Sequence, residues 1–324
     1  MNVTSAHFRL STFYFLLLVP LSCVAQGYDI AVIPMGATHE FWKAVHAGAL
    51  KAERELDASG IPVKVIWKGP LREDDRDQQI QVVENFVGRQ VNGIVLAPLD
   101  SRALVRPVEE AVSAHIPVVI FGSALRSPAP VSFVATDNRE GGRMGARRLG
   151  QLLGGKGKVI LLRCQAGSSA TEEREAGFLE VMRRDFPGIE LISTDQYGGA
   201  TRDTARRTSE NLLNRFGVEV NGVFASNESS ATGMLLALRD AGLAGGRVKF
   251  VGFDSGDTLL GGLKAGDIQG LVIQDPFAMG YLSVKTVVAA LRGESVPRAI
   301  KTNLALVTPD NVDDPAIAAM LHPL

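Results

Sequence analysis

Short aliphatic runs alternate along the chain with segments whose apolar residues recur at helical spacing. The runs predict about ten strands, at Ile30–Met35, Val63–Trp67, Gly93–Pro98, Val118–Phe121, Val131–Ala135, Lys158–Leu162, Ile189–Ser193, Gly222–Ala225, Val248–Phe253 and Ile268–Ile273. Helices are predicted between them, including 171–186, 202–216 and 228–241. Strands that are aliphatic throughout are buried on both faces, so the pattern predicts an α/β fold of parallel sheets flanked by helices. One open sheet of that width is uncommon, and we expect two sheets of about five or six strands.

The first 25 residues have the pattern of an export signal. Arg9 provides a positive start, Leu10–Leu21 is apolar but too short to span a membrane, and Cys23-Val24-Ala25 is a small-x-small cleavage pattern. We therefore predict a secretory signal at residues 1–25, cleaved after Ala25. Two alternatives are a lipoprotein signal with Cys23 acylated and an ordinary buried N-terminal element. No later segment has 18 uninterrupted apolar residues.

Composition and charge exclude several classes of protein. Hydrophobic residues make up 46% and charged residues 21%, which excludes an intrinsically disordered chain. Lysine and arginine number 34 against 35 aspartate and glutamate, so there is no basic footprint for a nucleic acid. Two cysteines form neither a disulfide scaffold nor a four-ligand zinc site. Cys164 follows a predicted buried strand, and we expect it to be a small core residue.

Polar residues stand directly after several predicted strands. Asn227, Asp254 and Gln274 follow three of them, and ligands of open α/β sheets bind at the carboxyl ends of the strands. Short planar groups that accept and donate in pairs suit a ligand rich in hydroxyls. Phe41 and Trp42 follow the first strand and offer flat faces for the C–H side of a sugar ring. The alternatives are that Asn227 is a helix N-cap and that the aromatic pair is core packing.

These residues resemble those of periplasmic solute-binding proteins of the ribose-binding type, which share their fold with the lactose-repressor ligand core. The resemblance covers essentially all of 28–310, and its motifs keep the family's order and spacing. They are Ile30-Ala31-Val32-Ile33 with Phe41-Trp42 and Gly48-Ala49, Gly93-Ile94-Val95-Leu96-Ala97-Pro98, Ile116-Pro117-Val118-Val119, Thr136-Asp137-Asn138 with Gly141-Gly142, Gly167 to Gly177 with Arg174, Phe224-Ala225-Ser226-Asn227, Val251-Gly252-Phe253-Asp254 and Ile273-Gln274-Asp275-Pro276.

The resemblance implies two Rossmann-like lobes joined by three crossovers, with the ligand in the cleft between the lobes. The crossovers are expected near Ala135–Asn138, Gln274–Asp275 and Asn303–Val307. The N-terminal lobe would comprise 26–135 plus 275–303, and the C-terminal lobe 136–274 plus 304–324.

The resemblance also implies a set of ligand contacts. Carried over by motif, they are Phe41, Trp42, Arg174, Asn227, Asp254 and Gln274. The chain departs from the family in the N-terminal lobe, where Gly122-Ser123 replaces an Asp-Arg pair, Ala97 replaces an asparagine, and His39 replaces another. The usual charged fork is therefore missing, and Ser123, His39 and Lys68 are our candidates for polar groups on this side.

Signatures of catalysis are missing from the sequence. Gly252-Phe253-Asp254-Ser255-Gly256 places Asp254 where a hydrolase would carry serine. His39 and His46 have helical spacing but no carboxylate or thiol in register, so we expect no metal site. We expect no catalytic residue and no cofactor, and an enzyme on this fold remains the minor alternative.

The predicted function is that of an exported, periplasmic binding protein for an ABC importer. Its partners would be a carbohydrate or polyol ligand and a membrane ABC permease, with no nucleic acid, and it would act as a monomer. Hinge closure around the ligand would be the mechanism. The alternative is a sensor component that presents a sugar or a furanose-like quorum signal to a membrane receptor. A transcription-factor core is excluded because no helix-turn-helix precedes Tyr28.

Overall fold

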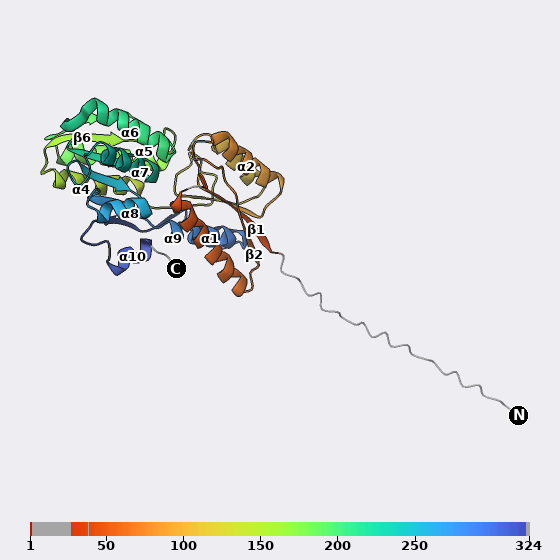
Figure 1. Ribbon diagram of the computed structural model, residues 1–324. Coiled ribbons are helices and arrows are strands. Elements are labelled where there is room, and N and C mark those ends of the chain that lie inside the picture. Colours follow the sequence, from red (N-terminus) through yellow and green to blue (C-terminus); the bar gives the residue numbers. More distant parts are fainter. Residues whose placement is uncertain (2–26, 38, 322–324) are drawn as a thin grey trace.

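Two separate six-stranded sheets organise the chain, each in a lobe of its own (Figure 1). The structure is a computed structural model that describes residues 1, 27–37 and 39–321. Apart from residue 1, the predicted signal with Cys23 lies outside the described residues. Two sheets of predominantly parallel strands flanked by helices confirm the predicted fold class.

The N-terminal lobe contains a fully parallel sheet with the strand order β11-β5-β4-β3-β1-β2. Its strands are β1 (Tyr28–Ile33), β2 (Val63–Trp67), β3 (Gly93–Leu96), β4 (Val118–Phe121), β5 (Ser132–Ala135) and β11 (Ala299–Lys301). One face packs on α1 (Glu40–Ala58) and α9 (Pro276–Leu291). The other packs on α2 (Arg76–Gly88) and α3 (Val105–Ser113), so the lobe has three layers.

The C-terminal lobe repeats this arrangement with the order β12-β10-β9-β8-β6-β7. Its strands are β6 (Gly157–Leu162), β7 (Ile189–Ser193), β8 (Gly222–Ala225), β9 (Lys249–Phe253), β10 (Gly270–Gln274) and β12 (Leu304–Val307). Helices α4 (Asn138–Leu152) and α5 (Ser169–Asp185) cover one face. The other face carries α6 (Arg202–Phe216), which leads into the 3-10 turn Gly217–Glu219, α7 (Glu228–Asp240), α8 (Asp257–Lys264) and α10 (Pro315–Leu321).

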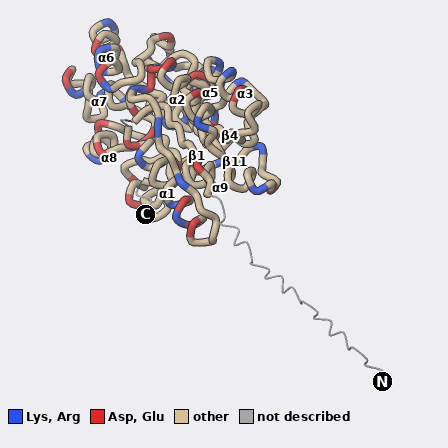
Figure 2. The backbone as a smooth tube through the Cα atoms, turned by 90° about the vertical axis from the view of Figure 1, so that its right-hand side faces the viewer, with Lys and Arg blue, Asp and Glu red and all other residues tan. Residues whose placement is uncertain are grey.

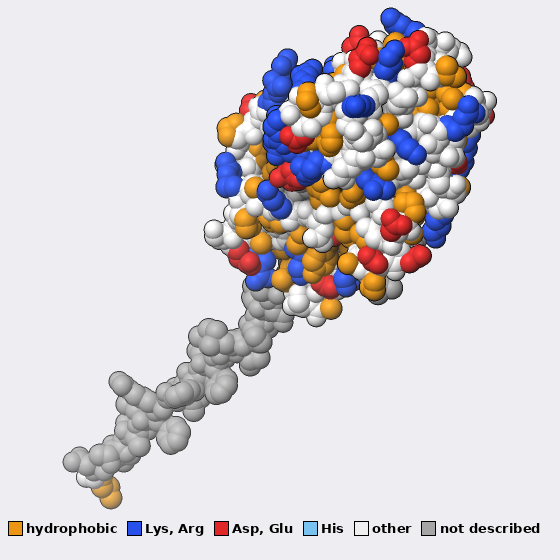
Figure 3. Space-filling model, turned by 90° about the vertical axis from the view of Figure 1, so that its left-hand side faces the viewer, with side chains coloured by type: hydrophobic (Ala, Val, Ile, Leu, Met, Phe, Trp, Pro, Cys, Tyr) orange, Lys and Arg blue, Asp and Glu red, His pale blue; other side chains and the backbone are white. Residues whose placement is uncertain are grey.

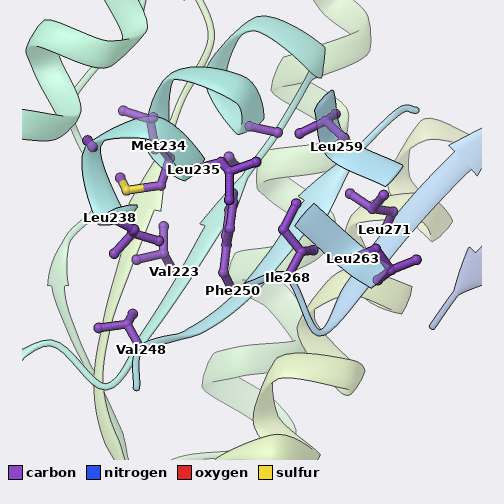
Figure 4. Packing of buried hydrophobic residues seen from close by; sticks show 14 of the residues in the cluster. Val223, Met234, Leu235, Leu238, Val248, Phe250, Leu259, Leu263, Ile268 and Leu271 are labelled. Carbon is purple, nitrogen blue, oxygen red and sulfur yellow. The ribbon is translucent and has the colours of Figure 1, made fainter. Parts of the chain in front are cut away.

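The core of the C-terminal lobe is built around Phe250, whose side chain is fully buried. Leu235 and Leu238 of α7 lie on one side of this ring, and Leu263 of α8 and Leu271 of β10 lie toward the other (Figure 4). Burying one such apolar side chain contributes about 1.5–3 kcal/mol to folding. The sheet is thereby a rigid platform for the polar residues at its strand ends.

In the N-terminal lobe, α1 and α9 lie side by side although they are far apart in sequence (Figure 1). A Cβ added to Gly48 would lie 2.0 Å from the carbonyl oxygen of Phe277, and one added to Gly280 would lie 2.0 Å from that of Val45. Glycine is therefore required at both positions for the two helix backbones to come this close.

The chain passes between the lobes three times, between β5 and α4, between β10 and α9, and between β11 and β12. The three passages are hydrogen bonded to one another. Thr302 N donates to Ala135 O at 3.1 Å, and Asn303 Nδ2 donates to Asp275 Oδ2 at 3.1 Å. The first two passages lie at the predicted crossovers. The third comprises Thr302 and Asn303, at the start of the predicted Asn303–Val307, whose other residues form β12.

The prediction missed β11, β12 and α10 at the end of the chain, and β12 departs from the expected parallel pairing. It runs antiparallel to β10, with Gln274 opposite Leu304. The reason is its connection, because β12 follows β11 after two residues with no helix between them. β12 therefore enters the second sheet at the hinge, beside the carboxyl end of β10, and runs back along it.

Acidic and basic residues alternate along the backbone in Figure 2, and charges of both signs are interspersed over the face shown in Figure 3. The arginine-rich stretch of α4 is paired with acidic residues rather than free. Arg139 and Arg143 both contact Glu180 at 3.1 Å, and Arg147 pairs with Glu140. Within the described residues, no helix is both long and apolar enough to cross a membrane.

Candidate functional site

A cavity lies between the two lobes at the carboxyl ends of their strands. Its empty space, including solvent at the mouth, is about 550 Å³. Residues from both lobes line it, namely Met35, His39, Phe41, Trp42, Glu73, Gly122, Cys164, Gln165, Ser168, Ala170, Thr171, Arg174, Asn227, Glu228, Asp254 and Gln274. Seven of the nine predicted site residues are among them.

Asp254 lies at the centre of the C-terminal side of the cavity. It follows β9 directly and has φ +69°, a left-handed conformation that is uncommon outside glycine and is found at functional sites. Its Oδ1 accepts a hydrogen bond from Gln274 Nε2 at 2.6 Å, and its Oδ2 accepts one from Glu228 N at 3.1 Å. The carboxylate is thus held in a single orientation at the strand end.

The Arg174 guanidinium is buried beside Asp254, with 5% of the residue exposed. Its Nε donates to Asn138 Oδ1 at 2.8 Å, and its Nη1 donates to Ser226 O at 3.0 Å and lies 3.7 Å from Asp254 Oδ2. It also stacks over the Phe253 ring, 3.8 Å from the ring centroid. These contacts fix the arginine before any ligand binds.

The position of Arg174 depends on how closely α4 and α5 pack. A Cβ added to Gly142 of α4 would lie 1.8 Å from Arg174 O, so only glycine permits this approach. The Gly141-Gly142 motif therefore lets the two helix backbones come close together, and this position of α5 determines where the Arg174 side chain enters the cavity.

Asn227 has two roles that the sequence left as alternatives. Its Oδ1 accepts from Ser230 N at 3.1 Å, so it is the N-cap of α7, and the residue also lines the cavity. Its Nδ2 donates to Ser229 Oγ at 2.9 Å. The cap orients the side chain without removing it from the cavity wall.

The N-terminal lobe contributes aromatic rings to the opposite wall. Phe41 and Trp42 meet edge to face with ring centroids 4.9 Å apart, and Trp42 contacts Phe121 in the same way at 6.1 Å. Trp42 is only 5% exposed, and its Nε1 donates to Glu73 Oε1 at 2.5 Å. Trp42 is thus both a core residue of its lobe and part of the cavity wall.

His39 and Glu73 form a buried pair on the same wall, with Nδ1 and Oε1 2.8 Å apart. Burial disfavours the charged imidazole, but the hydrogen bond and the charge of Glu73 outweigh it and raise the pKa of His39. Glu228 faces the cavity from the other lobe. Burial raises its pKa, opposed by the charges of His39 and Arg202 and a hydrogen bond from Arg202.

Two predicted site residues lie outside the cavity lining. Lys68 is exposed, because β2 is an edge strand and the chain leaves the sheet there. Ser123 is buried beside the cavity, and its Oγ accepts a hydrogen bond from Ala170 N of the other lobe at 3.2 Å. Ser123 joins the two lobes, and its neighbour Gly122 lines the cavity instead.

The lobes contact each other on several sides of the cavity, so the structure is closed. Ser101 N donates to Gly167 O at 3.0 Å, and Gln165 Nε2 donates to Glu73 O at 2.9 Å. Asp257 N donates to Glu40 Oε2 at 3.2 Å.

Two acidic residues of the cavity, Glu73 and Glu228, were not among the predicted contacts. Glu73 belongs to the charged run before α2, and Asp75 of the same run is the N-cap of that helix. The sequence carries no signal that Glu73 turns inward. Glu228 stands directly after the predicted Asn227 and was visible only as its neighbour.

Metal-binding chemistry has no support in the part of the chain that the structure describes. No group of three or more His, Cys, Asp or Glu side chains there could hold a metal ion. His46 instead stacks on Trp67, with ring centroids 4.4 Å apart. The thiol of Cys164 is buried, and burial raises its pKa well above the ordinary value.

Two α/β lobes that are joined by three passages of the chain and line a polar cavity between them define a two-lobed binding protein. Comparison with known proteins gives the family: residues 30–295 match the periplasmic binding protein domain, and the chain belongs to that family. The ribose import binding protein RbsB of Haemophilus influenzae is 30% identical over 294 residues, covering 90% of this chain and 96% of that protein. The family is one of binding proteins, not of enzymes.

Two further proteins are similar over most of their length. The xylitol-binding protein of Mycolicibacterium smegmatis is 28% identical, covering 78% of this chain and 70% of that protein. The crystal structure of a carbohydrate transporter solute-binding protein from Agrobacterium radiobacter, in complex with D-arabinose, superimposes with a TM-score of 0.85. It is 35% identical, covering 91% of this chain and 99% of that chain.

Proposed function

We propose that this protein captures a sugar or polyol in the cavity between its lobes and delivers it to an ABC permease. The observation that carries the proposal is the arrangement of the cavity walls. Aromatic rings of the N-terminal lobe face Arg174, Asn227, Asp254 and Gln274 of the C-terminal lobe across one enclosed space. Rings cover the C–H face of a sugar, and carboxylate and amide groups bind its hydroxyls.

The relatives support the ligand class. Proteins named for ribose and xylitol and a structure with D-arabinose span sugars and a polyol, whose shared chemistry is a row of neighbouring hydroxyls. The ribose protein is named for import and the protein with D-arabinose for a carbohydrate transporter, which favours transport over the sensory alternative. We infer that His39 touches the ligand from the N-terminal wall. The other predicted contacts that we infer to touch it are Phe41, Trp42, Arg174, Asn227, Asp254 and Gln274.

Hinge closure is the mechanism that we infer. A ligand that contacts both walls binds the closed state more tightly than the open one and shifts the population toward it by that difference in affinity. The lobes would move as two bodies, 26–135 plus 275–303 and 136–274 plus 304–324. The membership of β11 in the first sheet and of β12 in the second supports this division.

The remaining parts of the proposal concern location and assembly. The signal pattern at residues 1–25 supports export to the periplasm with cleavage after Ala25. Both walls of the cavity come from one chain, which is consistent with a monomer as the binding unit.

Thermal unfolding in the presence of candidate ligands tests the function. The chain from Gln26 onward would be freed of co-purified ligand by unfolding and refolding, then heated with ribose, arabinose, xylitol, tagatose and fucose. Free ligand at about 100 times its Kd stabilises the folded state by about 2.7 kcal/mol, a shift of a few degrees. Amino acids at the same concentrations are the control. Stabilisation by no hydroxylated ligand would overturn the proposal.

A further inference from the structure

Two buried oxygens in the cavity wall have no hydrogen-bond partner in the described protein. They are Glu228 Oε2 and Gln274 Oε1, on residues that are 2% and 4% exposed. Other unpartnered buried side-chain atoms of the described chain belong to residues that do not line the cavity. Buried polar atoms are almost always paired in folded proteins, so an unpaired one in a cavity wall indicates a contact supplied by a ligand.

The Glu228 carboxylate is fixed by its other contacts. Arg202 Nη2 donates to Oε1 at 2.5 Å, and the backbone N of Glu228 donates to Asp254 Oδ2 at 3.1 Å. Glu228 is also the first residue of α7, where the helix dipole favours a negative charge. One oxygen is therefore occupied, and the other remains as an acceptor.

The orientation of the Gln274 amide follows from its partner. Its nitrogen lies 2.6 Å from Asp254 Oδ1, and an ionised carboxylate only accepts hydrogen bonds. The NH₂ group must therefore face Asp254, which leaves the amide oxygen free. Both unpaired atoms of the cavity wall are thus acceptors, and a ligand must bring donors to them.

The charges of the wall favour a neutral donor. Each carboxylate lies near a basic group of the protein: Glu73 with His39, Glu228 with Arg202, and Asp254 with Arg174. These basic groups all face protein carboxylates, so an anionic ligand finds no unshared one among them. A hydroxyl supplies the missing donor without adding charge.

We propose that Glu228 is a specificity-determining ligand-binding residue whose Oε2 accepts a hydrogen bond from one ligand hydroxyl, beside a second hydroxyl on Gln274 Oε1. This rests on the proposed function and adds to it the chemistry of one subsite. The preferred ligand is a neutral polyol with a donor at that position, and sugars that carry a carboxylate are rejected.

The test removes a hydroxyl of the ligand in one experiment and the carboxylate of Glu228 in another. Titration calorimetry compares a sugar that binds the wild-type protein with its monodeoxy and deoxyfluoro analogues, since fluorine cannot donate. At one ring position of the sugar, we expect the deoxy and the deoxyfluoro analogue to bind wild type at least about tenfold more weakly than the parent sugar. The reason is that each leaves a buried acceptor unpaired. In Glu228→Ala, the affinities of the parent sugar and of these two analogues should differ by less than about threefold.

Glu228→Gln is the second variant, because it preserves the size of the side chain and the contact with Arg202. Its amide oxygen would take the Arg202 bond and turn an NH₂ toward the cavity, so the discrimination should be lost here too. Glu210→Gln is the matched control, an exposed glutamate paired with Arg206 at 2.9 Å, and it should behave as wild type.

The outcomes separate this inference from the proposed function. If wild type binds a sugar but both Glu228 variants keep the position-specific loss, the role of Glu228 is wrong and the function stands. Binding of the matching sugar acid as tightly as the parent also overturns the charge part of the proposal. If wild type binds no hydroxylated ligand at all, the function and this inference fall together.

Discussion

The side chain of Asn138 links Arg174 to the end of β4 in the other lobe. Asn138 Oδ1 accepts from Arg174 Nε at 2.8 Å, and Asn138 Nδ2 donates to Gly122 O at 3.2 Å. Asn138 is the first residue of α4, directly after the first passage between the lobes. The guanidinium in the cavity is therefore oriented by a residue that itself contacts both lobes at the hinge.

We expect Asn138→Ala to lower ligand affinity about tenfold, because the buried Arg174 Nε loses its acceptor and the link to Gly122 is broken. Titration calorimetry with the sugar that best stabilises wild type measures this. Asn92→Ala is the control, since Asn92 Oδ1 accepts from Asp29 N at 2.7 Å at the far end of the first sheet. An Asn138→Ala protein that loses stability but keeps full affinity would contradict the orienting role.

Asp254→Asn should weaken binding about 30-fold or more while the protein stays folded. Asparagine tolerates the left-handed backbone at this position, but one of its two acceptor oxygens becomes a donor. The new side-chain NH₂ would face either the NH₂ group of Gln274 or the backbone N–H of Glu228, both of which donate to Asp254 in wild type. Two donors that face each other cost about 2 kcal/mol. Asp185→Asn, which removes an exposed ion pair with Arg184, should have no effect on affinity.

Ligand binding should change the intrinsic fluorescence of the protein through Trp42 alone. The chain has two tryptophans, of which Trp42 lines the cavity and Trp67 stacks on His46. We expect the change to persist in Trp67→Phe and to disappear in Trp42→Phe. A ligand-dependent signal that survives Trp42→Phe would show that the binding site lies elsewhere.

Gly142→Ala should destabilise the protein by about 2 kcal/mol or more, because the added methyl group overlaps the backbone of Arg174 and forces α4 and α5 apart. Affinity should fall with it, since Arg174 moves. The matched control is Gly261→Ala in α8, where nothing lies within 4 Å of the added group. That change should stabilise the helix by about 0.5–1 kcal/mol in urea denaturation.

The stability of the folded protein should fall as the pH rises above the ordinary histidine range. The pKa of His39 is raised above 6.5 because Glu73 outweighs burial, so the folded state holds this proton more tightly than the unfolded state. The resulting stabilisation is fully present below 6.5 and is lost as the pH rises through the raised pKa.

Urea denaturation from about pH 6 to about pH 8.5 measures this dependence. His39→Asn should flatten the decline, whereas His115→Asn, at an exposed turn, should leave it unchanged. A slope of the opposite sign in wild type would contradict the His39–Glu73 pairing.

The sheets were predictable because their strands are aliphatic throughout, and β2, β4, β7 and β8 begin and end where the pattern placed them. Short exposed segments such as β11 carry no such signal, because only one of its three residues is partly buried. The antiparallel β12 depends on a short connection between lobes, which periodicity does not encode.

The C-terminal wall of the cavity was predictable for the same reason, since Asn227, Asp254 and Gln274 lie at or just after the ends of buried strands, which meet at one edge. The N-terminal wall depends on loops, and loops follow no period. Lys68 and Glu73 both lie in the connection between β2 and α2, yet the first faces solvent and the second is buried against Trp42. Nothing in their sequence neighbourhood distinguishes the two.

Cys164 is the only cysteine of the described residues, and its thiol is buried with a raised pKa. Thiolates, not thiols, react with alkylating reagents, so this group is inert toward maleimide dyes at neutral pH. Among residues 39–321, a cysteine introduced at Ser255 would be the one thiol that is labelled. Ser255 borders the space beside Glu40 and Asp257, where the two lobes meet. Residues 39–321 are thereby already suited to becoming an optical reporter of a bound ligand, because they contain no other thiol that must be removed first.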